Sequence, residues 1–132
     1  MNPKPTVLLV EDNEDDAALA EMALARSGHD HTLRVARDGQ EAIEILHELQ
    51  PAGVQPALVL LDLKLPRVDG RGVLRELRGD PTTVRVPVVV LTSSRLEQDV
   101  LDAYALGANS YFQKPVDFAS FERDMALLLT TW

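Results

Sequence analysis

The amino-acid sequence predicts an α/β fold, a doubly wound parallel sheet of five strands with helices on both faces. Short apolar runs alternate five times with longer stretches of helical periodicity, without a repeat, linker or low-complexity segment. Such alternation is typical of parallel sheets whose right-handed crossover helices cover both faces. The chain has 132 residues, of which 45% are hydrophobic, so we expect one domain spanning residues 1–132.

Five segments are predicted strands. The runs Val7–Val10, Ala57–Leu61 and Val86–Leu91 are continuously apolar, as expected of strands buried on both faces. Thr32–Ala36 alternates apolar and polar residues, which indicates a strand at an edge of the sheet with one face more exposed to solvent. Ser110–Gln113 is a short fifth strand.

The segments that separate and follow these strands have helical periodicity. The predicted helices run from about residue 14 to 26, from Asp38-Gly39 to Pro51, from Gly70 to Gly79, from about 97 to 106 and from about 117 to 129. The expected core residues are Leu19, Met22 and Ala23 in the first, Ala42, Ile43, Leu46 and Leu49 in the second, Val73, Leu74 and Leu77 in the third, and Phe118, Phe121, Met125 and Leu128 in the last.

Charge and composition exclude several classes of function. The formal net charge of −8 argues against a general affinity for nucleic acid or anionic membranes, because both select basic surfaces. No apolar run has the length of a membrane span, and the first residues lack a signal-peptide core, so we expect a cytoplasmic protein. The absence of cysteine is compatible with that location and excludes disulfides and thiolate metal sites.

Polar side chains stand where the strands end. Glu11 and Asp12 follow the first strand, Asp62 follows the third, Thr92 ends the fourth and Lys114 follows the fifth. Because the carboxyl ends of parallel strands converge, these side chains should gather at one edge of the sheet. Clustered carboxylates repel unless a cation is present, and Mg²⁺ takes oxygen ligands and shares phosphate oxygens. A carboxylate between such an ion and an ammonium is well placed to accept a phosphoryl group.

Each of these residues also has a simpler interpretation. Glu11 and Asp12 can favour a helix dipole without a metal, and Asp62 can begin a turn. Thr92 can cap a helix, and Lys114 can be an ordinary exposed lysine. The functional interpretation is favoured because all of them stand at the ends of successive predicted strands.

These motifs, in this order and spacing, resemble the receiver domain of two-component response regulators over nearly the whole chain. The matching segments are Val10–Asn13, Leu61–Pro66 with Asp69-Gly70, Leu91–Ser93, Leu106–Ala108 and Lys114-Pro115. The resemblance implies a flavodoxin-like fold with strand order 2-1-3-4-5. It implies a sensor histidine kinase as partner. It also implies that the protein is not an enzyme, but accepts its own phosphoryl group and loses it by slow autodephosphorylation.

The resemblance also implies roles for individual residues around the expected phosphoacceptor, Asp62. Asp12, Asp62 and the backbone carbonyl of Lys64 are the expected Mg²⁺ ligands, with Glu11 acting through water. Lys64 and Ser94 occupy two variable positions that flank the phosphoryl group. We hypothesise that the charge of Lys64 alters the lifetime of phospho-Asp62; the alternative is that its side chain points into solvent.

The remaining matched residues are expected to bind the phosphoryl group and to report its presence. Thr92 should hydrogen-bond it, and Lys114 should pair with Asp62 and then with the phosphate. Pro115 is expected to follow a cis peptide bond that aims Lys114 inward. Tyr111 occupies the switch-aromatic position and should turn inward when Thr92 moves. A phosphoryl charge of roughly −1.5 to −2 is enough to bias such a two-state loop.

A finer resemblance is to single-domain regulators of bacterial and cyanobacterial phytochrome kinases. It rests on Asp62–Pro66, Asp80-Pro81, Val86–Ser94 and the long loop before Ala57. It implies a phytochrome-type histidine kinase as partner and no effector domain. The output should then be a protein contact, and we expect a homodimer through the last two helices and fifth strand. The apolar Leu127–Leu129 and Trp132 favour this, unless the helix end folds back onto the core.

Three rival functions fit the sequence less well. A haloacid-dehalogenase-type phosphatase needs a second Asp two residues after its nucleophile, where Lys64 stands. A nucleotide-binding loop needs more glycine than Gly70-Arg71-Gly72 supplies. The remaining alternative is a receiver-like module that binds partners without phosphorylation. Such a module typically lacks Asp62, Thr92 or Lys114, and this chain has all three.

Overall fold

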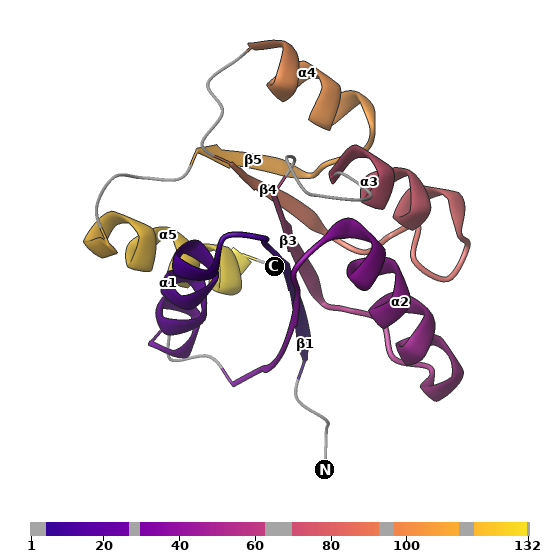
Figure 1. Cartoon of the computed structure of the whole chain (residues 1–132), viewed down its shortest axis with the longest axis horizontal. Helices are drawn as coiled ribbons and strands as arrows, with labels where there is room; N and C mark the ends of the chain where they lie inside the picture. The colour runs from indigo at the N-terminus through magenta and orange to yellow at the C-terminus, as the bar shows by residue number, and fades with distance from the viewer. Residues whose placement is uncertain (1–4, 27–29, 63–69, 93–96, 114–117, 132) are drawn as a thin grey trace.

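Five parallel strands form the sheet that the alternation predicts (Figure 1). The structure is a computed structural model that describes residues 5–26, 30–62, 70–92, 97–113 and 118–131. The strands are β1 (Thr6–Val10), β2 (Thr32–Ala36), β3 (Leu58–Leu61), β4 (Val88–Thr92) and β5 (Ser110–Gln113), in the order β2-β1-β3-β4-β5. The predicted fold class and strand order are therefore confirmed.

Five α-helices connect and follow the strands. They are α1 (Glu14–Ala25), α2 (Gly39–Leu49), α3 (Gly70–Gly79), α4 (Glu97–Ala105) and α5 (Phe118–Thr131), and a short 3₁₀ turn, η1 (Gln50–Ala52), follows α2. Side-chain caps define where two of them begin. Asn13 accepts a hydrogen bond from the Asp16 amide at 3.0 Å, and Asp38 accepts one from the Glu41 amide at 2.8 Å. No helix within the described part of the chain has the length and apolarity needed to cross a bilayer.

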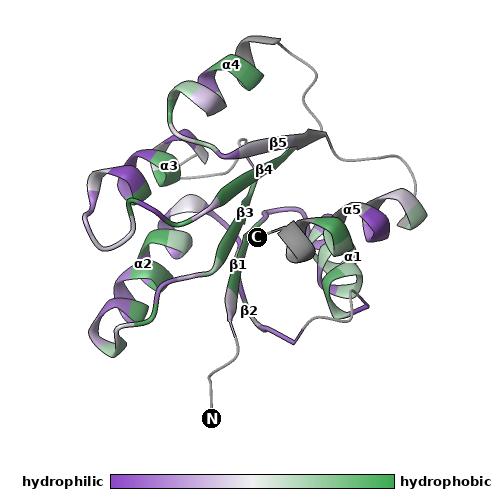
Figure 2. Ribbon diagram, turned by 180° about the vertical axis from the view of Figure 1, so that it is seen from behind, coloured by the Kyte–Doolittle hydropathy of each residue, from purple (hydrophilic) through white to green (hydrophobic). Residues whose placement is uncertain are grey.

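The helices cover both faces of the sheet, as Figures 1 and 2 show from opposite sides. On one face α1 and α5 pack over Val7, Leu9 and Leu60, and on the other α2 and α3 pack over Leu8 and Val10. Successive strand residues point to opposite faces, so the central strands must be apolar at every position. This arrangement explains why β1 and β3 read as unbroken apolar runs, and why β2 at the edge is only partly buried.

The predicted core face of α1 is wrong at two of its three residues. Leu19 and Met22 are 40% and 45% exposed, whereas Ala23 is buried as predicted. The helix instead packs through a stripe of mostly small side chains, Ala17, Ala20, Ala23 and Leu24. Helical spacing alone allows either stripe. The alanine stripe faces the core, and small side chains let α1 lie close to the sheet and to α5.

The buried faces of the other helices agree better with the core residues predicted from the sequence. Val73, Leu74 and Leu77 of α3 are fully buried, as predicted. In α2, Ala42 and Leu46 are buried as predicted, Ile43 and Leu49 are only partly buried, and Ile45 joins the core instead. In α5, Met125 is fully buried, and the side chains of Phe118, Phe121 and Leu128 lie outside the description.

Candidate functional site

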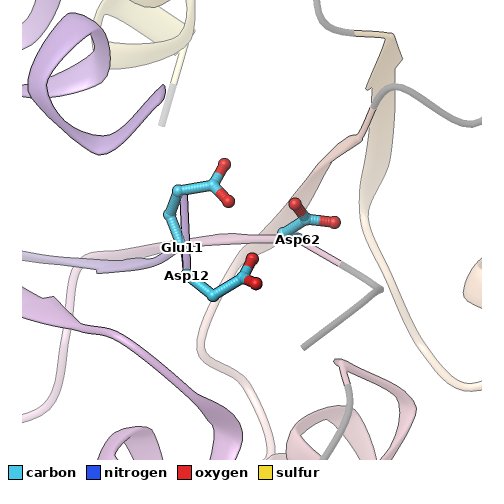
Figure 3. A group of neighbouring side chains, drawn as sticks. All are labelled: Glu11, Asp12 and Asp62. Atoms are coloured by element: carbon cyan, nitrogen blue, oxygen red, sulfur yellow. The ribbon is translucent and has the colours of Figure 1, made fainter. Parts of the chain in front are cut away.

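Three carboxylates meet at the carboxyl edge of the sheet, where β1 and β3 end (Figure 3). Oxygen atoms from Glu11, Asp12 and Asp62 all lie within 4.8 Å of one another. Glu11 and Asp62 are only 4% and 8% exposed, whereas Asp12 is exposed to solvent. The predicted cluster therefore exists, with two buried members and one that faces water.

The backbone of the central strands fixes the positions of these carboxylates. β1 and β3 are neighbours whose last pair is Val10 with Leu61. The Asp62 amide donates to the Val10 carbonyl at 3.1 Å, and the Glu11 amide donates to the Ala36 carbonyl at 2.9 Å. The ladder thus continues one residue beyond each strand and brings both side chains to the same edge.

Asn13 supports this edge and was not singled out as a site residue. Its amide donates to Oε2 of Glu11 at 3.4 Å, and its side chain caps α1. The first turn of that helix carries Glu14, Asp15 and Asp16. An asparagine directly before an acidic turn is a recognisable helix-start signal, so the cap was available from the sequence.

The donor set of the cluster fits a hard divalent cation. Carboxylate oxygens are the ligands that Mg²⁺, Mn²⁺ and Ca²⁺ prefer. Three negative charges this close repel one another, and two of them have lost most of their contact with water. A bound cation offsets both costs. Because Asp12 faces solvent, the cation would keep positions open toward water or a phosphate oxygen.

The structure places two further predicted site residues through the sheet. Thr92 is the last residue of β4, and because Leu61 pairs with Val90, it lies at the same edge as Asp62. Thr92 pairs with Gln113 of β5, the residue directly before Lys114. Tyr111 is partly buried and packs against the core between the sheet, α2 and α3.

Four predicted site residues lie outside the described residues: Lys64, Ser94, Lys114 and Pro115. Their expected roles, including the cis peptide bond at Pro115, stay predictions. Their places in the sequence remain informative. Lys64 comes two residues after Asp62, and Lys114 directly follows β5.

The sequence matches the family model described as "Response regulator receiver domain" over residues 7–125. A similar curated protein is Response regulator Rcp1 of Synechocystis sp., 44% identical over 118 residues that cover 86% of this chain and 78% of Rcp1. The solved Mn²⁺-bound form of Rcp1 has a TM-score of 0.83 at 38% identity, covering 98% of this chain and 94% of Rcp1.

Two further solved structures extend the similarity. The phosphorylated cyanobacterial phytochrome response regulator RcpA has a TM-score of 0.89 at 38% identity, covering 98% of this chain and 94% of RcpA. The bacteriophytochrome response regulator AtBRR has a TM-score of 0.78 at 43% identity, covering 96% and 92%. The chain therefore belongs to the response regulator receiver domain family of two-component signalling, and its homologues include the response regulators of phytochromes.

Proposed function

We propose that Asp62 is the residue that accepts the phosphoryl group from the phosphohistidine of a sensor histidine kinase. The observation that carries this proposal is the convergence of three carboxylate side chains within 4.8 Å around a buried Asp62. In the proposed site Asp12, Asp62 and the Lys64 carbonyl hold Mg²⁺, with Glu11 acting through water. When bound, the ion neutralises charge on the carboxylates and on the oxygens of the incoming phosphoryl group.

The transfer itself needs little from the protein beyond position and charge. An Oδ atom of Asp62 attacks phosphorus while the bond from phosphorus to the histidine nitrogen breaks, and an acyl phosphate forms. The leaving imidazole nitrogen keeps the bonding electron pair. Burial strips water from Asp62 and so removes a hydration shell that the attacking oxygen would otherwise have to shed.

Thr92, the last residue of β4, and Lys114, which follows β5 in the sequence, complete the proposed site. The Thr92 hydroxyl donates to a phosphoryl oxygen, and the Lys114 ammonium pairs with Asp62 before transfer and with the phosphate afterwards. The pairing of Thr92 with Gln113 supports this assignment, because Gln113, the residue directly before Lys114 in the sequence, lies at the edge that carries Asp62. Tyr111 is the aromatic side chain that turns inward when Thr92 moves to the phosphate. Its partial burial is compatible with an inward position.

The proposed phosphodonor is a phytochrome-type histidine kinase. The similarity to RcpA and AtBRR supports this choice, since both are named as phytochrome response regulators. We also propose that the protein is the acceptor of the group and does not turn over a separate substrate. Slow hydrolysis of its own acyl phosphate then returns it to the starting state.

Self-association through α4, β5 and α5 is the proposed output. Exposed Leu101 and Tyr104 on α4 and Leu127 on α5 support a contact surface there. Large exposed apolar side chains of this kind are enriched in interfaces. A receiver-like module that binds partners without phosphorylation is disfavoured, because it would not need the carboxylate cluster.

The test is incubation with a small phosphodonor and Mg²⁺, followed by intact-mass measurement. The wild-type protein should gain one phosphoryl group, and the Asp62→Asn variant should gain none. A wild-type protein that gains nothing over repeated incubations, or a gain that survives in Asp62→Asn, contradicts the proposal. The Asp15→Asn variant, altered at an exposed acid in the first turn of α1, is the matched control and should behave as wild type.

A further inference from the structure

The register of β5 against β4 decides which residue lies beside Thr92 at the carboxyl edge of the sheet. β5 is the last strand in the order, so within the described part of the sheet it pairs with one neighbour (Figure 1). Its four residues pair with Val89–Thr92, and the last pair is Thr92 with Gln113. A slip by one residue would replace Gln113 in that pair and would turn Tyr111 to the opposite face of the sheet.

The apolar pattern of β5 does not select one register. Tyr111 packs against the core, and Phe112 follows it directly in the sequence. A one-residue slip would therefore bring one aromatic residue to the place of the other on the core face. The strand is also short, and Ser110 and Gln113 at its ends are polar. Contacts outside the strand must therefore hold β5 in place.

Asn109, the residue before β5, makes one such contact with the start of β4. Its amide donates to the Val88 carbonyl at 2.8 Å, and its Oδ1 accepts from the Val88 amide at 2.8 Å. Both backbone hydrogen-bonding groups of Val88, the first residue of β4, are thus paired with one residue. A shift of β5 by one position would break both hydrogen bonds at once.

Arg78 of α3 binds Asn109 and also the segment that leads into β4. Its Nη2 donates to Oδ1 of Asn109 at 3.0 Å and to the Gly107 carbonyl at 2.8 Å, and its Nε donates to the same carbonyl at 3.0 Å. Its Nη1 donates to the carbonyls of Val84 and Val86 at 2.9 and 2.8 Å. These five hydrogen bonds equal the number of N–H groups in a guanidinium.

The guanidinium is planar, so these hydrogen bonds fix the segment before β4 relative to the segment before β5. A charged donor also makes them stronger than hydrogen bonds between neutral groups. Gly107 permits the close approach, since a Cβ atom there would lie 2.8 Å from Nε of Arg78. A lysine would keep the charge, but its three donors share one nitrogen and cannot reach carbonyls of both segments in this way.

We propose that Arg78 is a positioning residue that holds β5 in register on β4, from the end of the sheet opposite the phosphoryl site. Through that register it places Gln113 beside Thr92 and Tyr111 against the core. The consequence for phosphoryl binding rests on the proposed function, whereas the register does not depend on phosphorylation.

The first test is amide hydrogen exchange in the unphosphorylated protein. Arg78→Lys should speed exchange over residues 110–113 by about ten-fold or more, because it removes several hydrogen bonds from a charged donor. Exchange over residues 6–10 in β1 should keep its wild-type rate, which separates a local role from a general loss of stability. Arg75→Lys, at an exposed position of the same helix, is the matched control and should change neither rate.

Substitutions of Asn109 test the same contact without altering Arg78. Asn109→Ala removes the acceptor for Val88 and Arg78, so exchange over residues 110–113 should again be faster. Asn109→Asp keeps the acceptor oxygen and places a negative charge beside Arg78, so exchange should be no faster than in wild type. Unchanged exchange over residues 110–113 in Arg78→Lys, or equal acceleration in β1 and β5, contradicts the proposal.

The second measurement connects the register to the phosphoryl site. Molecules with a displaced β5 are not competent to bind, and the apparent affinity falls with the competent fraction. Arg78→Lys should therefore bind beryllium fluoride with Mg²⁺, a phosphoryl analogue, about two-fold or more weakly than wild type. Arg75→Lys should bind it as tightly as wild type.

Wild-type analogue affinity in Arg78→Lys, together with faster exchange in β5, contradicts a positioning role of Arg78 at the site. If the wild-type protein itself binds no analogue, the proposed function fails. The exchange measurement then still decides whether Arg78 holds β5 on β4.

Discussion

The Asp62 amide donates a hydrogen bond to the Val10 carbonyl over 3.1 Å, at the point where β3 and β1 leave the sheet. This bond sets the carboxylate of Asp62 beside those of Glu11 and Asp12, which follow Val10 directly. The chemistry of the site thus depends on backbone pairing in the most buried strands. That pairing is stable, so the carboxylates stay together although they repel one another.

Asp12 is the exposed member of the cluster, and its removal should weaken metal binding. Asp12→Asn keeps the size of the side chain and removes one charge, so affinity for Mg²⁺ or Mn²⁺ should fall by about ten-fold or more, as it does when even a supporting residue of a metal site is lost. Titration calorimetry measures this. Asp15→Asn is the control, and equal losses in the two variants would mean that bulk negative charge, and not ligation, attracts the ion.

Lys64 should set the lifetime of the acyl phosphate through its charge. An ammonium near the phosphoryl oxygens stabilises the bound group, so Lys64→Ala should release phosphate faster than wild type. Lys64→Met keeps most of the length of the side chain without the charge and should match Lys64→Ala. Hydrolysis followed by intact mass after removal of the phosphodonor gives the rates. A wild-type hydrolysis rate in Lys64→Ala would refute a role of Lys64 in the lifetime. A wild-type rate in Lys64→Met, together with a faster rate in Lys64→Ala, would assign the effect to the size of the side chain instead of its charge.

Asp80 should contribute a small acid-sensitive part of the stability. The backbone N–H and hydroxyl of Thr82 donate to Oδ1 of Asp80 at 2.9 and 2.8 Å and hold the pKa of this carboxyl below its ordinary value of 3.8. A carboxyl with a lowered folded pKa stabilises the fold fully above its unfolded pKa. That contribution is lost as the pH falls through the folded pKa.

The test compares urea unfolding of wild type and Asp80→Ala between neutral pH and pH about 3, around and below the unfolded pKa of aspartate. The two free energies of unfolding should differ most at neutral pH and converge as the pH falls below the ordinary value of 3.8. A difference that stays constant over this interval would show that the Thr82 contacts do not depend on the charge of Asp80.

A side chain at position 107, where the chain has glycine, should lower the stability of the fold. Its φ is +102°, which side chains rarely adopt, and a Cβ atom would lie 2.8 Å from Nε of Arg78. Gly107→Ala should therefore destabilise the fold by about 1–3 kcal/mol. Gly79, at the end of α3, is the matched control, because a Cβ there meets nothing within 4 Å. Chemical unfolding gives the free energy of unfolding of Gly107→Ala and of Gly79→Ala. An equal loss of stability in the two variants would contradict the account of Gly107.

The sequence predicted the architecture well because the relevant signals are local. Continuous apolar runs marked β1, β3 and β4 as central strands, and the alternation in Thr32–Ala36 marked β2 as an edge. The three acids of the cluster could be placed from the same pattern. Once a residue ends a parallel strand, the topology decides which edge it occupies.

What the sequence did not predict depends on packing between distant segments. Leu19 and Met22 have helical spacing, yet the alanines of α1 face the core, and only the contact with α5 and the sheet decides between those stripes. The bonds from Arg78 to Gly107 and from Arg71 to Asp102 join residues 29 and 31 positions apart. An arginine on a helix gives no local signal of which carbonyl or carboxylate it will meet.

The most direct test of the central claim identifies the phosphorylated atom by its chemistry. The protein is phosphorylated with a small phosphodonor and Mg²⁺ and reduced with borohydride, which converts an aspartyl phosphate to homoserine. The peptides that span the ends of β1 and β3 are then sequenced by mass spectrometry. We predict homoserine at position 62 and no conversion at Glu11 or Asp12. Homoserine at another aspartate, with Asp62 intact in fully phosphorylated protein, would contradict the account.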